Sequence, residues 1–403
     1  MQWYARVDVV LNLKSKLKEF GWLYGLNAHY KSAAVKRKYR VTAARYACLP
    51  PSRSFQELFG KHLKNEKHFA QIDRPLRIFF MGTDEQQDRS GTLQALAKIS
   101  ELTYFTRADG SYGQNDPSLP LFRKRANTER LSTLIKKHAD QGKPPDVLIA
   151  QTWAILVAPE ILSRIRQAYG TFIINISMDD RHQYWGAKLK GEWGGTFPLI
   201  PHIDLALTAA PECADWYMKE GCPAVFFPEA SDPEIFHPMP ELPKTHDVCF
   251  VGGCYGIREQ IVNALQNAGI RVSAFGGGWK GGRIDTESVP KLFAQSKIVL
   301  GVGTIGHCTD FFALKMRDFD GPMSGSCYIT HDNPDLYHVY EIGKEIVTYQ
   351  SISDCIDKVN YLLQNDAERE QIAEAGYQRA VKEHTWEKRF RTLTDLLKNG
   401  GIF

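Results

Sequence analysis

Residues 248–268 read VCFVGGCYGIREQIVNALQNA and place a short apolar run before a glycine-rich turn and a helical pattern. The run Val248–Val251 predicts a β-strand, and the apolar spacing over residues 257–268 predicts an α-helix. Glycines between the two let the chain turn tightly and bring backbone N–H groups close to a ligand. This strand–turn–helix unit predicts a parallel α/β sheet.

The same alternation extends in both directions from this unit. Strands are predicted at 76–81, 103–106, 146–150, 172–177, 205–208, 272–275, 298–302, 326–330 and 346–349. Helices are predicted at 92–99, 158–168, 211–219, 289–295, 353–364, 367–382 and 386–398. A proline-rich stretch at 237–243 divides the pattern into two groups. We therefore expect an α/β protein with two Rossmann-like, doubly wound domains that face each other across a cleft.

The expected organisation has four parts. A basic, mostly helical extension covers 1–72, a first domain covers 73–240 and a second covers 241–385. The last helix, within 386–403, is expected to return to the first domain.

Composition narrows the class of protein. The 403 residues are 43% hydrophobic and 24% charged, which is typical of globular chains. No apolar run approaches the ~18 residues that span a bilayer, and the N-terminus lacks a secretory pattern, so we expect a cytoplasmic protein. The eight cysteines form no C-x-x-C pair, which predicts reduced thiols and no metal site.

The charge is uneven along the chain. Residues 1–70 contain 14 Lys and Arg against 4 Asp and Glu, whereas the remainder contains 36 against 42. An apolar stripe beside the lysines predicts helices with a cationic face, at Leu11, Leu13, Leu17, Phe20, Leu23 and Leu26. Two interpretations stay open: this arm packs onto the body of the protein, or it contacts an anionic membrane surface.

Ligands of doubly wound sheets bind beyond the carboxyl ends of the strands, which directs attention to two glycine turns. Gly252 and Gly253 follow the first strand of the second domain, and Arg258 lies in the first turn of the next helix, where it can meet a diphosphate. The next strand leads into Gly276, Gly278 and Trp279. That second loop is either a flexible turn or a surface on which a nucleobase stacks.

The densest group of polar residues is LKMRDFDGPMSG at 314–325. Lys315 and Arg317 are expected to neutralise a diphosphate leaving group, and Asp320 to accept the ribose hydroxyls. Gly325 would permit close approach of the ligand. A solvated helix start is the simpler alternative for this segment.

The first domain offers a second set of strand ends. Thr83 and Asp84 follow one strand, Gln151 and Trp153 another, and Asp179 and Asp180 a third. The first four are expected to hold an acceptor. At most one of the two adjacent aspartates is expected to act as a general base, with a helix cap as the alternative role. His182 and His307 are further candidate bases.

Residues 247–391 resemble the glycosyltransferases of the spore-maturation CgeB-like group, within the wider GT-B glycosyltransferases. The resemblance rests on Cys249–Gly252, Tyr255, Gly256, Arg258, 276–279, 296–300, 317–325, 334–336, 343–347, Arg369, 373–377 and 383–386. Met178–Asp180 also resembles paired aspartates of that group.

The resemblance implies a metal-independent enzyme that needs no cofactor. It implies that the second domain binds a nucleotide-diphosphate sugar, UDP or GDP, through residues that include Tyr255, and that the first binds a glycan or lipid-linked acceptor. A carboxylate five residues before a glycine would hold the ribose, which maps onto Asp320 and Gly325. The resemblance favours retention of configuration, although Phe312 stands where related retaining families have a second glutamate.

These features predict a hexosyl-type glycosyltransferase of surface-polysaccharide biosynthesis, cytoplasmic or peripheral on the inner face of a membrane. Two alternatives stay open: a GT-B sugar-nucleotide epimerase, or a non-catalytic nucleotide- or glycan-binding protein. Neither glycine turn spells the G-x-G-x-x-G fingerprint of nicotinamide enzymes, and no nucleic-acid-binding module is recognisable.

Overall fold

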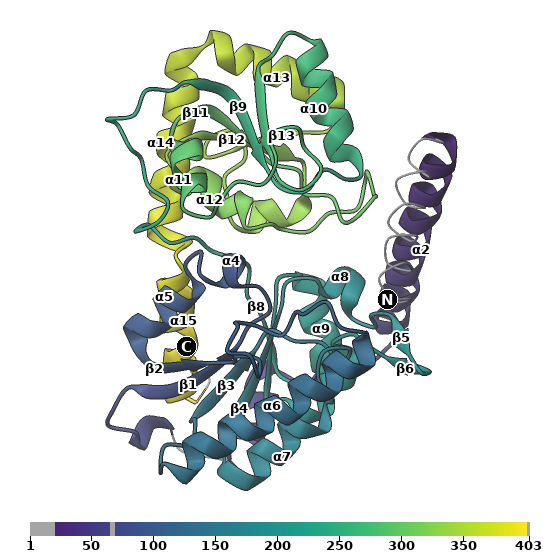
Figure 1. Ribbon diagram of the computed structural model, residues 1–403, viewed down its shortest axis with the longest axis vertical. Helices are drawn as coiled ribbons and strands as arrows, with labels where there is room; N and C mark the ends of the chain where they lie inside the picture. Colours follow the sequence, from purple (N-terminus) through teal and green to yellow (C-terminus); the bar gives the residue numbers. More distant parts are fainter. Residues whose placement is uncertain (1–20, 65–68, 401–403) are drawn as a thin grey trace.

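The computed structural model describes residues 21–64 and 69–400. Figure 1 shows two α/β domains, one above the other, with a long helix standing beside both. The chain passes from the first domain to the second through residues 227–245 and returns beside this linker, where the Ser231 N–H donates to the His384 carbonyl and the Trp386 N–H donates to the Ser231 carbonyl. None of the helices within the described ranges is long and apolar enough to cross a membrane.

The first domain is built on a six-stranded parallel sheet in the order β2-β1-β3-β4-β7-β8. Its strands are β1 Leu76–Met81, β2 Ser100–Tyr104, β3 Val147–Ala150, β4 Phe172–Ser177, β7 Leu205–Thr208 and β8 Ala224–Phe226. Its helices are α4 Glu85–Asp88, α5 Thr92–Ile99, α6 Pro120–Asp140, α7 Glu160–Tyr169, α8 Asp180–Gln183, the 3₁₀ helix η2 Phe197–His202 and α9 Pro211–Lys219. A short hairpin, β5 Lys188–Leu189 and β6 Glu192–Trp193, projects from it.

The second domain has a five-stranded parallel sheet in the order β10-β9-β11-β12-β13. Its strands are β9 His246–Val251, β10 Val272–Phe275, β11 Ser296–Leu300, β12 Cys327–His331 and β13 Val347–Tyr349. Its helices are α10 Ile257–Asn267, α11 Ser288–Ala294, α12 Arg317–Met323, the 3₁₀ helix η3 Pro334–His338, α13 Ile352–Gln364 and α14 Asp366–Glu383. In both sheets the order reverses beside the first strand, which creates a crevice at the carboxyl ends of the strands.

The last helix, α15 Trp386–Lys398, packs on the first domain. Trp386, Phe390 and Leu393 join the buried cluster that includes Ile78 and Leu96 of the first domain. The division of the chain at residues 72, 240 and 385 stays a prediction.

Several elements differ from the predictions, among them strand β8, which was not predicted. Strand β2 begins at Ser100 rather than at 103, because this edge strand is half exposed and gives a weak apolar signal. Helix α6 was not predicted, since its buried positions Asn127, Leu131 and Ile135 stand among charged residues. Residues 317–323 form helix α12, in agreement with the helix start given as the simpler alternative for this segment, and Pro322 is accommodated in its last turn.

The N-terminal part contains α2 Gly21–Ala47, α3 Phe55–Lys64 and the 3₁₀ helix η1 Phe69–Gln71. Helix α2 packs on the first domain through Tyr46, which is buried, stacks on Trp216 with ring centroids 5.4 Å apart and shares a 2.9 Å hydrogen bond with the Tyr184 hydroxyl. Packing on the body is therefore part of this arm's role. The predicted stripe positions Leu11, Leu13, Leu17 and Phe20 lie outside the described residues.

Candidate functional site

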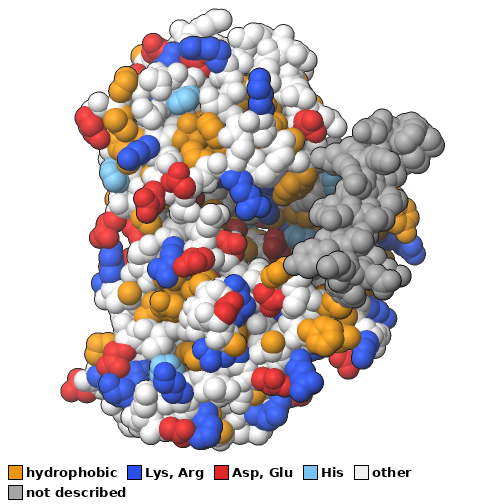
Figure 2. Space-filling view, viewed as in Figure 1, with side chains coloured by type: hydrophobic (Ala, Val, Ile, Leu, Met, Phe, Trp, Pro, Cys, Tyr) orange, Lys and Arg blue, Asp and Glu red, His pale blue; other side chains and the backbone are white. Residues whose placement is uncertain are grey.

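The carboxyl ends of both sheets point toward the space between the domains. Helices α4 and α8, which follow β1 and β4, lie on the face of the first domain that meets the second (Figure 1). Figure 2 shows a hollow at this junction, with blue cationic side chains on its upper rim and red carboxylates below them. This is where the candidate site is built.

The two glycine turns of the second domain pack on each other. A Cβ at Gly276, whose φ is 131°, would lie 2.3 Å from the carbonyl oxygen of Gly252. The Trp279 indole donates a hydrogen bond of 2.7 Å to that same oxygen, and its ring packs edge-on to Phe250. A Cβ at Gly278 would meet Cys254 at 3.0 Å. Trp279 therefore braces the two loops, and the stacking of a nucleobase on this loop stays a prediction.

Two guanidinium groups lie beside the first of these turns. Arg317 Nη1 donates to the Val251 carbonyl at 2.7 Å, and Arg258 Nη1 donates to the Gly253 carbonyl at 3.2 Å. Arg258 Nε and Arg317 Nε and Nη2 are buried without a hydrogen-bond partner in the described part of the chain. Burial, and next the charge of Arg317, lower the pKa of Arg258 to about 10. A buried guanidinium beside a half-buried one, both with buried donors that lack a partner among the described residues, forms a site that favours an anion.

Tyr255 lies at the mouth of this anion site. Its ring is 38% exposed and lies 4.1 Å from the Arg258 guanidinium, in a cation–π contact. The face of the ring thereby holds Arg258 in place.

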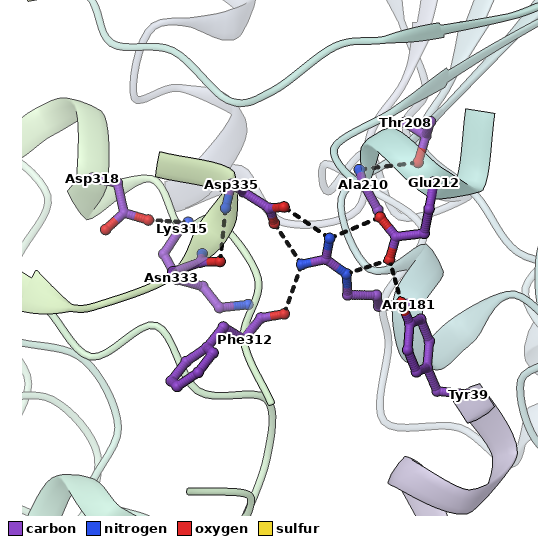
Figure 3. A network of polar contacts seen from close by, with 10 residues as sticks. All are labelled: Tyr39, Arg181, Thr208, Ala210, Glu212, Phe312, Lys315, Asp318, Asn333 and Asp335. Carbon is purple, nitrogen blue, oxygen red and sulfur yellow. Dashed lines mark hydrogen bonds and ion pairs between the residues drawn. The ribbon is translucent and has the colours of Figure 1, made fainter. Parts of the chain in front are cut away.

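Lys315 adds a third cation. Its backbone N–H donates to Asp318 Oδ2 at 2.7 Å, and Asp318 Oδ1 accepts from the Tyr328 hydroxyl at 2.6 Å. The Lys315 side chain extends away from Asp318, past Asn333 toward Phe312 (Figure 3). Burial lowers the pKa of His182, and the charge of Lys315 lowers it further. The same charge opposes the rise in the pKa of Glu229 that burial causes. Lys315 therefore lies at the junction of the domains.

The structure gives Asp320 and Gly325 different surroundings from those predicted. Asp320 is buried, and its Oδ1 accepts from the Ser231 hydroxyl at 2.7 Å. Burial raises its pKa to about 8. Gly325 has a φ of 69°, and a Cβ there would lie 2.6 Å from Pro238. Both residues face the interdomain linker. In this arrangement Asp320 does not line an open ribose pocket, and Gly325 is not open to close approach of a ligand.

Glu229 was missed by the sequence analysis. It follows β8 at the start of the linker, is buried, and its Oε2 has no hydrogen-bond partner within the described ranges. Burial raises its pKa to about 7, while the nearby charge of Lys315 opposes this shift. The negative charge of Asp179 adds to the rise in the pKa of Glu229. The only signal in the sequence was a glutamate directly after the last strand of the first domain.

The adjacent aspartates have different surroundings. Asp180 is buried; its Oδ1 accepts from the Thr196 hydroxyl at 2.7 Å and from the Tyr217 hydroxyl at 2.9 Å, and burial raises its pKa to about 6. It holds α8 in place and is inaccessible to an acceptor, so its expected catalytic role is corrected. Asp179 has a side chain that is 37% exposed and lies 3.7 Å from His182 Nε2. Asp179 is therefore the aspartate that can reach a ligand.

The crevice of the first domain holds the four predicted acceptor residues. The Thr83 backbone N–H donates to Asp88, and Asp84 caps α4 by accepting from the Gln87 N–H, so Asp84 has the structural role of a cap. Gln151 is buried. The Trp153 indole N–H is buried and unpaired in the part of the chain that is described, which makes Trp153 the best placed of the four to meet an acceptor.

Arg181 joins the two domains and was not predicted (Figure 3). Its guanidinium donates to Glu212 of α9 at 2.6 and 2.8 Å, and to Asp335 of η3 through both Nη atoms. It also donates to the Phe312 carbonyl oxygen at 2.9 Å. Glu212 accepts a further hydrogen bond of 2.9 Å from the Tyr39 hydroxyl of α2. The carboxylates on both sides of Arg181 thus hold the cleft wall together.

Within residues 21–64 and 69–400, no three His, Cys, Asp or Glu side chains lie together in a way that could hold a metal ion. His307, the other candidate base, lies edge-on to the Tyr255 ring, 6.3 Å between centroids. It lies at the second domain's rim, away from Asp179 on the first domain.

Comparison with solved structures identifies the architecture. The chain has the GT-B fold. A sucrose-phosphate synthase from Thermosynechococcus elongatus matches with a TM-score of 0.59 at 12% identity, over 80% of this chain and 98% of that one. HepE from Anabaena, in complex with UDP-glucose, matches with a TM-score of 0.57 at 9% identity, over 80% and 100%. AviGT4, a glycosyltransferase involved in avilamycin A biosynthesis, matches with a TM-score of 0.52 at 14% identity, over 81% and 99%.

The match found by sequence covers a smaller part of the chain than the structural matches do. Residues 258–395, which contain Arg258, Lys315 and Arg317 of this GT-B chain, match the family model described as glycosyl transferase-like. No curated protein sequence matches the chain. The finer resemblance to the CgeB-like group stays a prediction.

Proposed function

We propose that this chain is a glycosyltransferase that moves a sugar from a nucleoside-diphosphate sugar to a glycan or lipid-linked acceptor. One observation carries the proposal. Arg258 is buried and Arg317 is half-buried beside it at the glycine turn after β9, and both have buried N–H donors that no described residue accepts. A diphosphate supplies the negative charge and the acceptor oxygens that these donors lack. The glycosyl transferase-like match over residues 258–395 supports the same chemistry.

The donor we propose is a UDP-sugar, ahead of a GDP-sugar. HepE, which shares the GT-B fold, was solved with UDP-glucose. The diphosphate would lie against Gly252 and Gly253, within reach of Arg258, Arg317 and Lys315. Tyr255 would border it at the exposed rim.

In the proposed reaction the bond between the anomeric carbon and the diphosphate oxygen breaks, and a bond from the acceptor oxygen to that carbon forms. The charge that develops on the leaving diphosphate is stabilised by Lys315 and Arg317, a preorganised electrostatic role. The proton leaves the acceptor hydroxyl for a carboxylate, for which we propose Asp179 because its side chain is partly exposed and lies 3.7 Å from His182 Nε2. We propose retention of configuration and no metal or cofactor requirement.

The acceptor is proposed to bind in the crevice of the first domain, beside Trp153. The excess of cations in residues 1–70 favours an acceptor held at an anionic membrane, so we place the enzyme on the cytoplasmic face of a membrane, in surface-polysaccharide assembly. This membrane contact is separable from the donor site, and each has its own test.

The test is a thermal-shift series with UDP, GDP, dTDP, CMP and NAD, followed by incubation with the corresponding sugar nucleotide. We expect one nucleoside diphosphate to raise the melting temperature, since a ligand that binds only the folded state stabilises it. Release of that diphosphate on adding an acceptor supports transfer. Formation of an isomerised donor would instead indicate an epimerase. Binding without turnover would indicate a non-catalytic protein. A response to NAD alone would refute the proposal.

A further inference from the structure

A hollow of about 490 Å³ lies between helix α2 and the hairpin β5–β6, on the flank of the first domain. Its lining includes Ala34, Arg37, Val41, Arg45, Trp185 and Trp193. The proposed donor site uses none of these residues. Its size is that of a small-molecule pocket.

The walls of the hollow are fixed by contacts within the protein. The Trp185 indole donates to the Thr42 hydroxyl at 3.0 Å, and its ring lies 4.1 Å from that of Phe197. Lys38 donates to the Gly186 carbonyl and lies over the Trp193 ring, 4.7 Å from its centroid. Two half-buried indoles therefore form a rigid aromatic wall.

The lining carries only positive charge. Arg37, Lys38 and Arg45 are present without a carboxylate among the lining residues. Helix α2 as a whole contains six Lys and Arg and no Asp or Glu. Lys36 is paired with Asp310 at 2.7 Å and Arg45 lies 3.9 Å from Glu220, whereas no ion pair involves Arg37 or Arg40 among the residues described. The hollow is therefore suited to an anion.

The same helix exposes apolar side chains that a soluble glycan would not require. Tyr30 is 74% exposed and Val41, which lines the hollow, is 62% exposed. Exposed apolar groups beside arginine, lysine and tryptophan are typical of protein surfaces that lie in a membrane interface. Tyr30 and Val41 thus favour a lipid surface over a free saccharide.

We infer that this hollow binds the phosphate headgroup of an anionic membrane lipid. The phosphate meets Arg37 and Arg45, and the glycerol and first acyl carbons lie against Val41 and Trp193. This inference rests on the membrane contact in the proposed function and assigns it to a site. Trp185 is four residues from Arg181 in the cleft wall, so a chain bound in this way holds its cleft close to a lipid-linked acceptor.

The experiment is co-sedimentation of the full chain with vesicles of phosphatidylglycerol and phosphatidylcholine, compared with vesicles of phosphatidylcholine alone. Two changes address the hollow: the double variant Arg37→Gln/Arg45→Gln removes its charge, and Ala34→Phe fills it without changing charge. Arg40→Gln is the matched control, because Arg40 is exposed on the same helix but does not line the hollow. The UDP-induced melting shift reports folding and the donor site in every variant.

We expect binding to the anionic vesicles only. Each arginine near the surface contributes about 1 kcal/mol, so the double variant should bind about thirtyfold more weakly. Ala34→Phe should reduce binding at least fivefold, and Arg40→Gln should change it less than either. The UDP response should be unchanged throughout.

Three results would overturn the inference. A single variant, Arg37→Gln, is compared with Arg40→Gln. Equal losses of vesicle binding in these two variants, with full binding in Ala34→Phe, would show that diffuse surface charge attracts the vesicles without a defined site. A melting shift with soluble glycerol phosphate, matched by loss of vesicle binding in its presence, would indicate a soluble phosphate ligand. Absence of vesicle binding with an intact UDP response would reject the lipid site while leaving the proposed transfer reaction in place.

Discussion

Arg181 of α8 and Asp335 of η3 form a two-point ion pair across the cleft, with Arg181 Nη2 2.8 Å from Asp335 Oδ1. Their side chains are 12% and 6% exposed, so solvent screens this pair little. The same guanidinium is held on its other side by Glu212. Arg181 is thus one of the contacts that hold the two domains in their relative position, two residues from Asp179 in the chain and close to Lys315.

Replacing Arg181 with Ala should loosen the cleft and leave Asp335 as a buried, unpaired carboxylate. Breaking a buried ion pair by removing one partner costs about 3 kcal/mol, which urea denaturation will measure. Small-angle scattering should show a larger radius of gyration, and transfer activity should fall. Arg391→Ala, at an exposed ion pair on α15, is the control and should change stability by less than about 1 kcal/mol. An unchanged radius and stability in Arg181→Ala would show that the pair does not hold the domains.

Lys315→Ala should keep the fold and slow transfer. The cation is placed to stabilise charge on the leaving diphosphate, and loss of such a contact costs about 2.7–4 kcal/mol at the transition state. We expect kcat to fall at least tenfold, with a melting temperature close to that of the wild type. Lys344→Ala, at an exposed pair with Glu341, should retain full activity. Kinetics like those of the wild type in Lys315→Ala would remove Lys315 from the site.

Sequence patterns predict best the elements whose structure depends on residues nearby in the chain. Strands β4 and β7 are buried along their whole length, and their predicted bounds are those observed. The position of Arg258 beside the Gly252 turn also follows from neighbouring residues, since a strand, a turn and a helix place it.

Glu229 and Arg181 could not be predicted in the same way. The electrostatic surroundings of Glu229 include Lys315, which belongs to the other domain. The role of Arg181 depends on its ion pair with Asp335, 154 residues away along the chain. Asp320 shows the converse, because a local motif predicted a ligand role for it, whereas in the structure its Oδ1 accepts from the hydroxyl of the linker residue Ser231. Only the packing of the domains decides these roles.

Glu229→Gln should change how stability depends on pH. Burial raises the pKa of Glu229 to about 7, above that of the unfolded chain, so the folded state keeps a proton that the unfolded state releases. This carboxyl therefore contributes stability below about pH 4.5, and the contribution is lost as the pH rises toward about 7, by up to about 3 kcal/mol. Urea denaturation at pH 5 and pH 8 should show that Glu229→Gln gains stability relative to the wild type at the higher pH. Glu129→Gln, at an exposed ion pair on α6, should run parallel to the wild type, and parallel behaviour of Glu229→Gln as well would contradict the assignment.

Gly276→Ala should disrupt the paired glycine turns and with them the donor site. The new Cβ would lie 2.3 Å from the Gly252 carbonyl oxygen, at a φ of 131° that side chains rarely adopt. Strain of this kind costs about 1–3 kcal/mol, and the Gly252 turn would have to move from its place beside Arg317. We expect calorimetry to show at least tenfold weaker binding of UDP. Gly277→Ala is the matched control one residue away, because a Cβ at Gly277 meets nothing within 4 Å. Equal affinities in the two variants would show that the packing of these loops does not shape the donor site.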